Sequence, residues 1–144
     1  MTQNGTNSDK FHNLCNDQGP TLTLIKTTEN KVFGGFTPLD WKNEGGFIVD
    51  ESMITFLFSL NLCKKYNLKD KENVAIKCKF AQGPCFGNGD IIIYQNMKEG
   101  KAYANNKSVF FSDGNLELIE YMGEVKGFKG FTVAEIEVYK IIYN

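Results

Sequence analysis

Two glutamates near the C-terminal end of the chain have the spacing of neighbouring carboxylates on one face of a strand. Glu135 and Glu137 are two residues apart within 131–143 (FTVAEIEVYKIIY). On a strand both side chains point to the same side, roughly 7 Å apart. Glycosidases use paired carboxylates, but the acid and the base must reach the bond from opposing walls of a cleft. We therefore interpret the pair as a solvated or partner-contacting strand face, with a small hydrolase as an alternative function.

The cysteines and the single histidine are the other groups that could do chemistry. A zinc site built from His12, Cys15, Cys78 and Cys85 lacks the CxxC pair typical of structural zinc, so no metal is expected. Cys85 lies beside glycines and Cys15 ends a short helix, so a thiol-based oxidant scavenger is a second alternative. The sequence places no fixed cation beside either thiol, which favours ordinary free cysteines.

A glycine-rich run at residues 83–90 (GPCFGNGD) has the composition of a phosphate-binding loop. It lacks the lysine and hydroxyl of the GxxxxGK[ST] motif, and no amphipathic helix follows it to offer an N-terminus to an anion. We interpret it as a turn whose glycines adopt positive φ before a strand. The sequence therefore predicts no cofactor and no catalytic residue set.

Length, composition and charge narrow the class of protein. The chain has 144 residues, 42% of them hydrophobic and 12 of them Phe, which is enough for one domain with a substantial core. The formal net charge is -1 and every cation is Lys, so nucleic acid is not an expected partner. Residues 1–10 are polar, and no run approaches 18 apolar residues. A cytoplasmic protein without direct membrane insertion is expected.

Strands dominate the elements that must position these residues. Residues 21–28 and 31–37 predict a hairpin, and the Gly34–Gly35 pair in its second strand indicates a bulge or the close approach of another backbone. Residues 54–60 (ITFLFSL) are apolar at nearly every position and predict a strand buried on both faces, with Phe56 and Phe58 turned inward.

The remaining patterns complete the predicted fold. Alternation predicts a strand at 73–80, and further strands are predicted at 91–94 and 131–143, with short ones at 109–112 and 116–122. Ser8 or Asp9 caps a short helix that ends before Gly19. Seven or eight strands without βαβ alternation predict an α+β, mainly β fold, namely a two-sheet antiparallel β-sandwich with a few peripheral short helices. Residues 1–10 are expected to form a disordered polar N-terminus and 11–144 one domain.

Four segments in this order resemble the TLDc domain family. They are residues 11–41 (FHNLCNDQGPTLTLIKTTENKVFGGFTPLDW), 56–60 (FLFSL), 83–93 (GPCFGNGDIII) and 131–141 (FTVAEIEVYKI). The resemblance spans about residues 11–142. The family's domain ordinarily opens with further helical and strand elements, including a tryptophan-containing segment, whereas here only about ten polar residues precede the FHNLC-like helix.

The resemblance implies a function as well as a fold. It implies a β-sandwich flanked by helices, resistance to oxidative stress, and binding to a subunit of the vacuolar-type proton ATPase to regulate its assembly. It supplies no catalytic residues, so the expected role is a non-enzymatic protein-interaction domain. Aromatic residues beside glycines are either core or anchors for a partner. The partner-binding candidates are Phe33, Gly34, Gly35, Phe36, Trp41, Phe86, Glu135 and Glu137.

Overall fold

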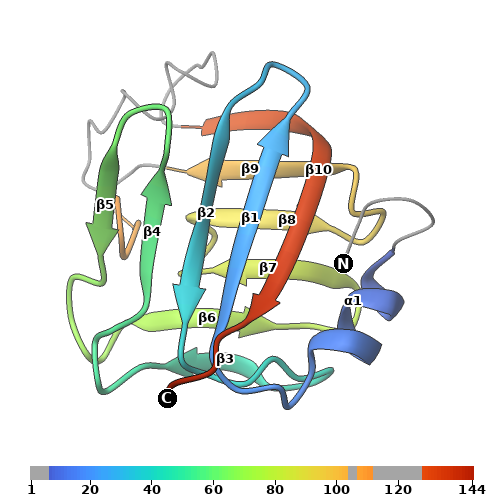
Figure 1. The fold of residues 1–144 in the computed structure, drawn as a ribbon. Coiled ribbons are helices and arrows are strands. Elements are labelled where there is room, and N and C mark those ends of the chain that lie inside the picture. The colour runs from blue at the N-terminus through green and yellow to red at the C-terminus, as the bar shows by residue number, and fades with distance from the viewer. Residues whose placement is uncertain (1–6, 104–106, 112–127) are drawn as a thin grey trace.

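The computed structural model describes residues 7–103, 107–111 and 128–144 (Figure 1). In these residues one short helix accompanies ten strands, and all strand pairs are antiparallel, which confirms the mainly β prediction. The elements are α1 (Ser8–Cys15), β1 (Thr21–Thr27), β2 (Val32–Thr37), β3 (Gly46–Val49), β4 (Phe56–Ser59), β5 (Lys64–Asn67), β6 (Val74–Cys78), β7 (Gln82–Phe86), β8 (Ile91–Tyr94), β9 (Glu99–Tyr103) and β10 (Phe128–Lys140).

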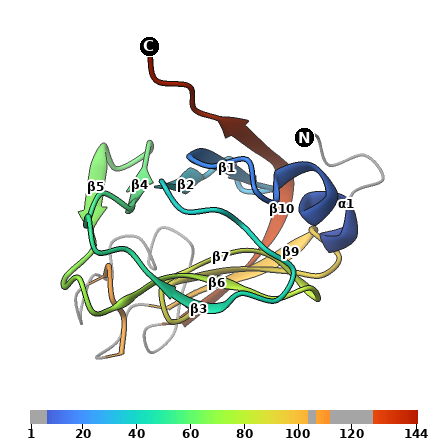
Figure 2. The same cartoon turned by 90° about the horizontal axis from the view of Figure 1, so that it is seen from below.

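The expectation of two separate sheets is corrected by the pairing of β10. All ten strands form one sheet in the order β3-β6-β7-β8-β9-β10-β1-β2-β4-β5. The first part of β10 pairs with β9 as far as Thr132, and the rest pairs with β1 from Val133 onward. A register shift at this point accompanies the bend of the strand. Figure 2 shows the two halves as facing layers, with β10 passing from one to the other.

The core fills the space between the two halves. Phe33 of β2 meets Phe131 of β10 edge to face with ring centroids 5.0 Å apart, and Trp41 meets Phe86 of β7 in the same manner at 5.5 Å. The indole Nε1 of Trp41 donates a hydrogen bond of 2.9 Å to Thr21 Oγ1, so its polar group is satisfied inside the core. The first contact joins β2 to the part of β10 that pairs with β9, and the second joins the loop after β2 to β7, so both contacts connect the two halves of the sheet.

The hairpin predicted from residues 21–37 is confirmed as β1 and β2. Asn30 turns the chain with a φ of 62°, and its N–H donates to Thr27 O. The two glycines of β2 admit close neighbours on opposite faces of the strand. A Cβ on Gly34 would lie 1.9 Å from Thr23 O and 3.1 Å from the Phe58 ring, and one on Gly35 would lie 2.7 Å from the Phe86 ring. The predicted close approach is therefore confirmed.

The prediction for residues 54–60 is confirmed as a strand but is wrong about its faces. In β4 it is Leu57 and Ser59 that are buried, whereas Phe56 and Phe58 are half-buried on the opposite side. Ile54 and Leu60 lie outside the strand and are 48% and 57% exposed. An apolar run does not reveal which alternate set faces the core, because both sets are hydrophobic.

Two acidic residues hold loops by accepting backbone hydrogen bonds. Asp50 accepts from the N–H groups of Ser52 and Thr55 and from both hydroxyls. Burial alone would raise the pKa of Asp50, but these hydrogen bonds together outweigh it and lower the pKa. Asp90 ties residues 109–111 to the turn before β8, because its carboxylate accepts from three successive N–H groups there at 2.9–3.2 Å.

Helix α1 covers one edge of the core. Asn7 is its N-cap and not Ser8 or Asp9 as predicted, and its side chain accepts from the Lys10 N–H. Because the helix begins at Ser8, residues 8–10 of the expected disordered N-terminus belong to it. Phe11 and Cys15 are buried one turn apart. His12 is also buried, and its Nε2 lies 2.8 Å from Lys79 O and 3.0 Å from Gln82 O.

Candidate functional site

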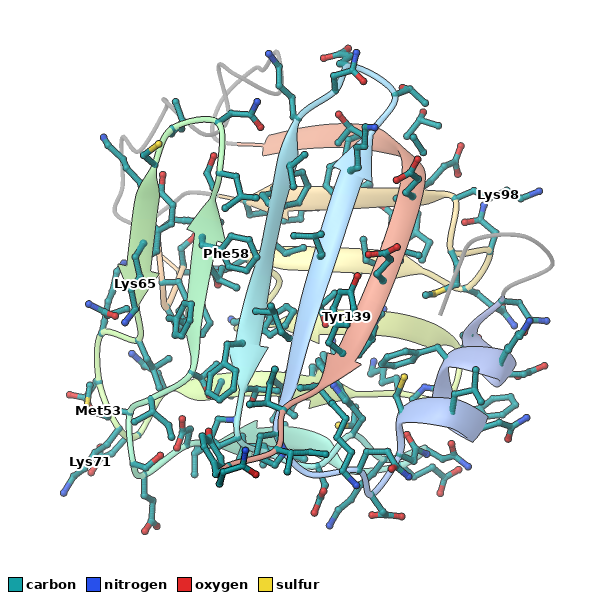
Figure 3. All side chains as sticks on the ribbon, in the orientation of Figure 1. Met53, Phe58, Lys65, Lys71, Lys98 and Tyr139 are labelled. Atoms are coloured by element: carbon teal, nitrogen blue, oxygen red, sulfur yellow. The ribbon has the colours of Figure 1, made fainter. Side chains whose placement is uncertain are left out.

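The most distinctive surface is the face of β10, β1, β2, β4 and β5 that points away from the core, here called the outer face (Figure 3). Alternation sends Thr21, Thr23 and Ile25 of β1 into the core and leaves Leu22 and Leu24 half-buried on this face. The neighbouring strands contribute further large apolar side chains, namely Phe36, Phe56, Phe58 and Tyr139. Among the described residues no helix or strand covers them (Figure 2).

Cross-strand pairing organises the aromatic part of the outer face. Phe36 and Phe56 are opposite each other on β2 and β4, and their rings stack with centroids 5.5 Å apart. Phe58 is opposite Gly34, and its ring occupies the space that a side chain at Gly34 would need. Lys65 of β5 places its ammonium 4.3 Å from the centre of the Phe56 ring. The result is an accessible aromatic surface bordered by a cation.

Acidic groups border the opposite side of the outer face. Glu137 lies beside Leu24 in the register of β10 and β1, and its carboxylate accepts a hydrogen bond from the Tyr139 hydroxyl. That hydrogen bond raises the pKa of the Tyr139 hydroxyl. Glu135 forms an exposed ion pair with Lys26, with Oε1 and Nζ 3.9 Å apart. The outer face thus has an apolar centre, carboxylates along β10 and lysine along β5.

The structure divides the sequence-predicted partner candidates into two groups. Phe33, Trp41 and Phe86 are at most 1% exposed and pack in the core, so they cannot anchor a partner without unfolding. Phe36, Glu135 and Glu137 lie on the outer face. The glycines at 34 and 35 contribute space, on the outer face for Phe58 and on the inner face for Phe86. Burial separates side chains that the sequence pattern had grouped together.

Phe56, Phe58 and Tyr139 are outer-face residues that sequence reasoning missed. The first two had been assigned to the core, since a run of consecutive apolar residues hides its exposed set. The sequence of β1 carries no signal against that assignment, because Leu22 and Leu24 alternate with threonines and only the structure shows that the threonine set is the buried one. Once β1 pairs with β2 and β2 with β4, that alternation determines the orientation of β4.

The geometry of the glutamate pair does not favour hydrolysis. Glu135 and Glu137 do share one face of β10 as predicted, but that face is open, and the nearest ionic partner of Glu135 is Lys26 on the adjacent strand. A hollow of about 450 Å³ at the bend of the sheet is lined instead by Glu29, Glu99 and Lys101. The predicted pair therefore lacks a facing wall that would place a bond between two carboxyl groups.

The thiols proposed for redox chemistry lie inside the fold. Burial raises the pKa of Cys85 to about 12 and that of Cys15 to about 11, so both remain protonated at neutral pH. Cys78 is also buried, and desolvation raises its pKa. Cys63 is exposed at the turn before β5. The two cysteines named in the scavenger alternative are thus the ones least able to form an accessible thiolate.

The glycine-rich run 83–90 is partly a strand. Its first residues belong to β7, and the turn proper is 87–90, where Gly87 and Gly89 have φ of 66° and 100° as the turn prediction requires. Asp90, the last residue of the run, closes this turn, and no separate role was predicted for it. Its carboxylate faces backbone N–H groups of residues 109–111, and burial raises its pKa against the effect of those hydrogen bonds. Its visible role is to hold chain segments together.

The described residues contain neither a metal-binding group of side chains nor a helix that could span a membrane. In residues 7–103, 107–111 and 128–144, no three His, Cys, Asp or Glu side chains gather into a group able to hold a metal ion, and the four residues considered for zinc form no such group. Within the same residues, α1 is far too short to span a bilayer and no longer apolar helix occurs.

Comparison with known proteins identifies the class to which this fold belongs. Residues 1–142, nearly the whole chain, match the family model of the TLDc domain. The protein therefore belongs to the TLDc domain family, as the ordered segments of its sequence indicated. A comparison with curated proteins gave no match.

Proposed function

We propose that this TLDc domain is a non-enzymatic protein-interaction module that binds its partner through the outer face. The observation that carries the proposal is the accessible apolar centre of that face, formed by Phe36, Phe56 and Phe58. Large apolar patches bordered by polar residues mark protein-binding surfaces, and aromatic anchors dominate binding energies there. The carboxylates of β10 and Lys65 of β5 would set the orientation of the partner.

Family membership supports the choice of partner and setting. TLDc domains are associated with resistance to oxidative stress and with the vacuolar-type proton ATPase. We therefore propose a subunit of that ATPase as the partner and the cytoplasm as the location. The hydrolase and scavenger alternatives have no comparable support, because their glutamates face open solvent and their thiols are buried.

A binding experiment with purified vacuolar-type proton ATPase tests this proposal. Phe58→Lys places a charge in the apolar centre of the outer face, and we expect it to reduce capture of the ATPase by at least ten-fold, since loss of an aromatic anchor typically costs about 2 kcal/mol or more. Phe47→Lys is the matched control, because Phe47 is 58% exposed on the edge strand β3. Melting curves must show that both variants are folded.

Two outcomes would contradict the proposal. Equal loss of binding in both variants would mean that the outer face has no special role. Unchanged binding in the folded Phe58→Lys variant would exclude the apolar centre as the contact surface. Cell survival in peroxide provides the functional measurement, and it should follow ATPase capture across the same variants.

A further inference from the structure

The outer face has an internal symmetry that is visible in its strand register. The five strands lie in the order β10-β1-β2-β4-β5, so β2 is central. One row across them reads Glu137, Leu24, Gly34, Phe58 and Lys65. When this row is reversed about Gly34, Glu137 and Lys65 exchange places, and so do Leu24 and Phe58. A face with this property is complementary to a second copy of itself.

We propose that the chain forms a twofold dimer in which the outer faces of two copies pack against each other. This inference rests on the proposed role of the outer face as a protein-binding surface. The dimer buries the outer face of each copy, so the second copy and the ATPase subunit compete for it. A twofold axis parallel to β2, midway between the outer faces of the two copies, places β10 of one copy over β5 of the other. A twofold interface must be self-complementary in this way, since each contact occurs twice.

Charge complementarity selects a second copy as the occupant. In the dimer, Glu137 of each copy lies opposite Lys65 of the other, so two anion–cation contacts form at the two sides of the interface. Among the described residues no ion pair within one chain engages either side chain; Glu137 accepts from the Tyr139 hydroxyl, and Lys65 lies over a phenylalanine ring. Both charges are therefore available across an interface.

The apolar centre is complementary in size as well. The half-buried Phe58 lies opposite Leu24 of the second copy, and in the next row Phe56 lies opposite Leu22. Gly34 and Phe36 of β2 both lie on the axis. The Phe58 ring covers Gly34, and Phe36 of one copy lies opposite Phe36 of the other. Stacked sheets pack about 10 Å apart with interdigitated side chains, which this alternation of large and smaller groups permits.

Sedimentation equilibrium over a range of protein concentrations tests the dimer through a charge swap. Lys65→Glu and Glu137→Lys each replace two attractive contacts by two repulsive ones, and each should weaken dimerisation about ten-fold or more. The double variant Lys65→Glu/Glu137→Lys restores opposite charges and should dimerise nearly as well as the wild type. An equimolar mixture of the two single variants should pair with each other. Lys98→Glu, on the exposed turn before β9, is the charge-matched control and should leave dimerisation unchanged.

The results separate this inference from the proposed function. A wild-type chain that is monomeric at every concentration, or single variants that dimerise like the wild type, would overturn the second-copy dimer. Failure of the double variant to recover would also overturn it, because the charges would then not face each other. If the chain is monomeric and Phe58→Lys weakens ATPase binding, the proposed function stands and the dimer is excluded. If the charge-swap variants behave as expected but Phe58→Lys leaves ATPase binding unchanged, the dimer stands and the proposed function is wrong.

Discussion

Leu57 and Phe58 are neighbours on β4 that the structure assigns to opposite faces, and truncating each to alanine tests that assignment. Leu57 is 1% exposed, and its Cδ2 lies 2.8 Å from the position that a Cβ on Gly35 would occupy, so it fills the space beside that glycine. Leu57→Ala creates a cavity in the core and should lower the free energy of unfolding by about 2–5 kcal/mol. Phe58 is half-buried, so Phe58→Ala should cost only about 1–2 kcal/mol.

Thermal and urea denaturation followed by circular dichroism measure this difference. For a domain of this size, Leu57→Ala should lower the melting temperature by roughly 6–15 °C and Phe58→Ala by roughly a third of that. The urea m-value should stay the same in both variants, because both remain two-state and compact. If Phe58→Ala is the more destabilising of the two, β4 has the opposite orientation. The outer face would then lose its aromatic centre.

Three further predictions follow from other parts of the fold. Gly35→Ala introduces a Cβ 2.7 Å from the Phe86 ring and should cost about 1–3 kcal/mol of unfolding free energy in urea titrations; a neutral result would mean that the two layers are not in contact at this point. Asp50→Asn removes a carboxylate whose pKa is lowered on folding, because its hydrogen bonds outweigh its burial. A lowered folded-state pKa stabilises the fold above the unfolded value of about 4, and this contribution is lost as the pH falls through the folded value. The melting-temperature difference from the wild type should therefore be largest near neutral pH and shrink in acid, and a difference that grows in acid would refute the assignment. A disulfide reagent should modify Cys63 rapidly in the native protein and Cys85 only on unfolding; fast modification of Cys85, whose pKa burial raises to about 12, would revive the thiol alternative.

The sequence predicted those elements whose pattern is local. The β1–β2 hairpin follows from β-branched alternation and from Asn30 at the turn, and β8 and β10 follow from short β-rich runs. Strands β3, β5, β7 and β9 were not predicted, because runs such as KKYN and EGKAY have little apolar alternation and become strands only through pairing with neighbours. The expected strand at 109–112 is not a strand in residues 109–111, and the one at 116–122 lies outside the described residues.

The candidate site was only partly predictable, for a physical reason that particular residues show. Phe33 and Phe36 flank the same two glycines, yet one is 1% exposed and the other lies on the outer face. Their three-residue separation on a strand already implies opposite faces, but the sequence does not say which face is covered. Likewise, the bend of β10 that joins the two layers depends on long-range pairing with β9 and β1. Local pattern carries no signal for it.

The outer face is proposed as the surface through which this TLDc domain binds a protein. Site-specific photo-crosslinking in a complex with purified vacuolar-type proton ATPase tests it most directly. A photoreactive phenylalanine analogue at position 58 should crosslink to an ATPase subunit, and the same analogue at exposed position 47 should not. Crosslinking from position 47 alone, or binding that persists with no crosslink from position 58, would mean that the ATPase does not contact the outer face.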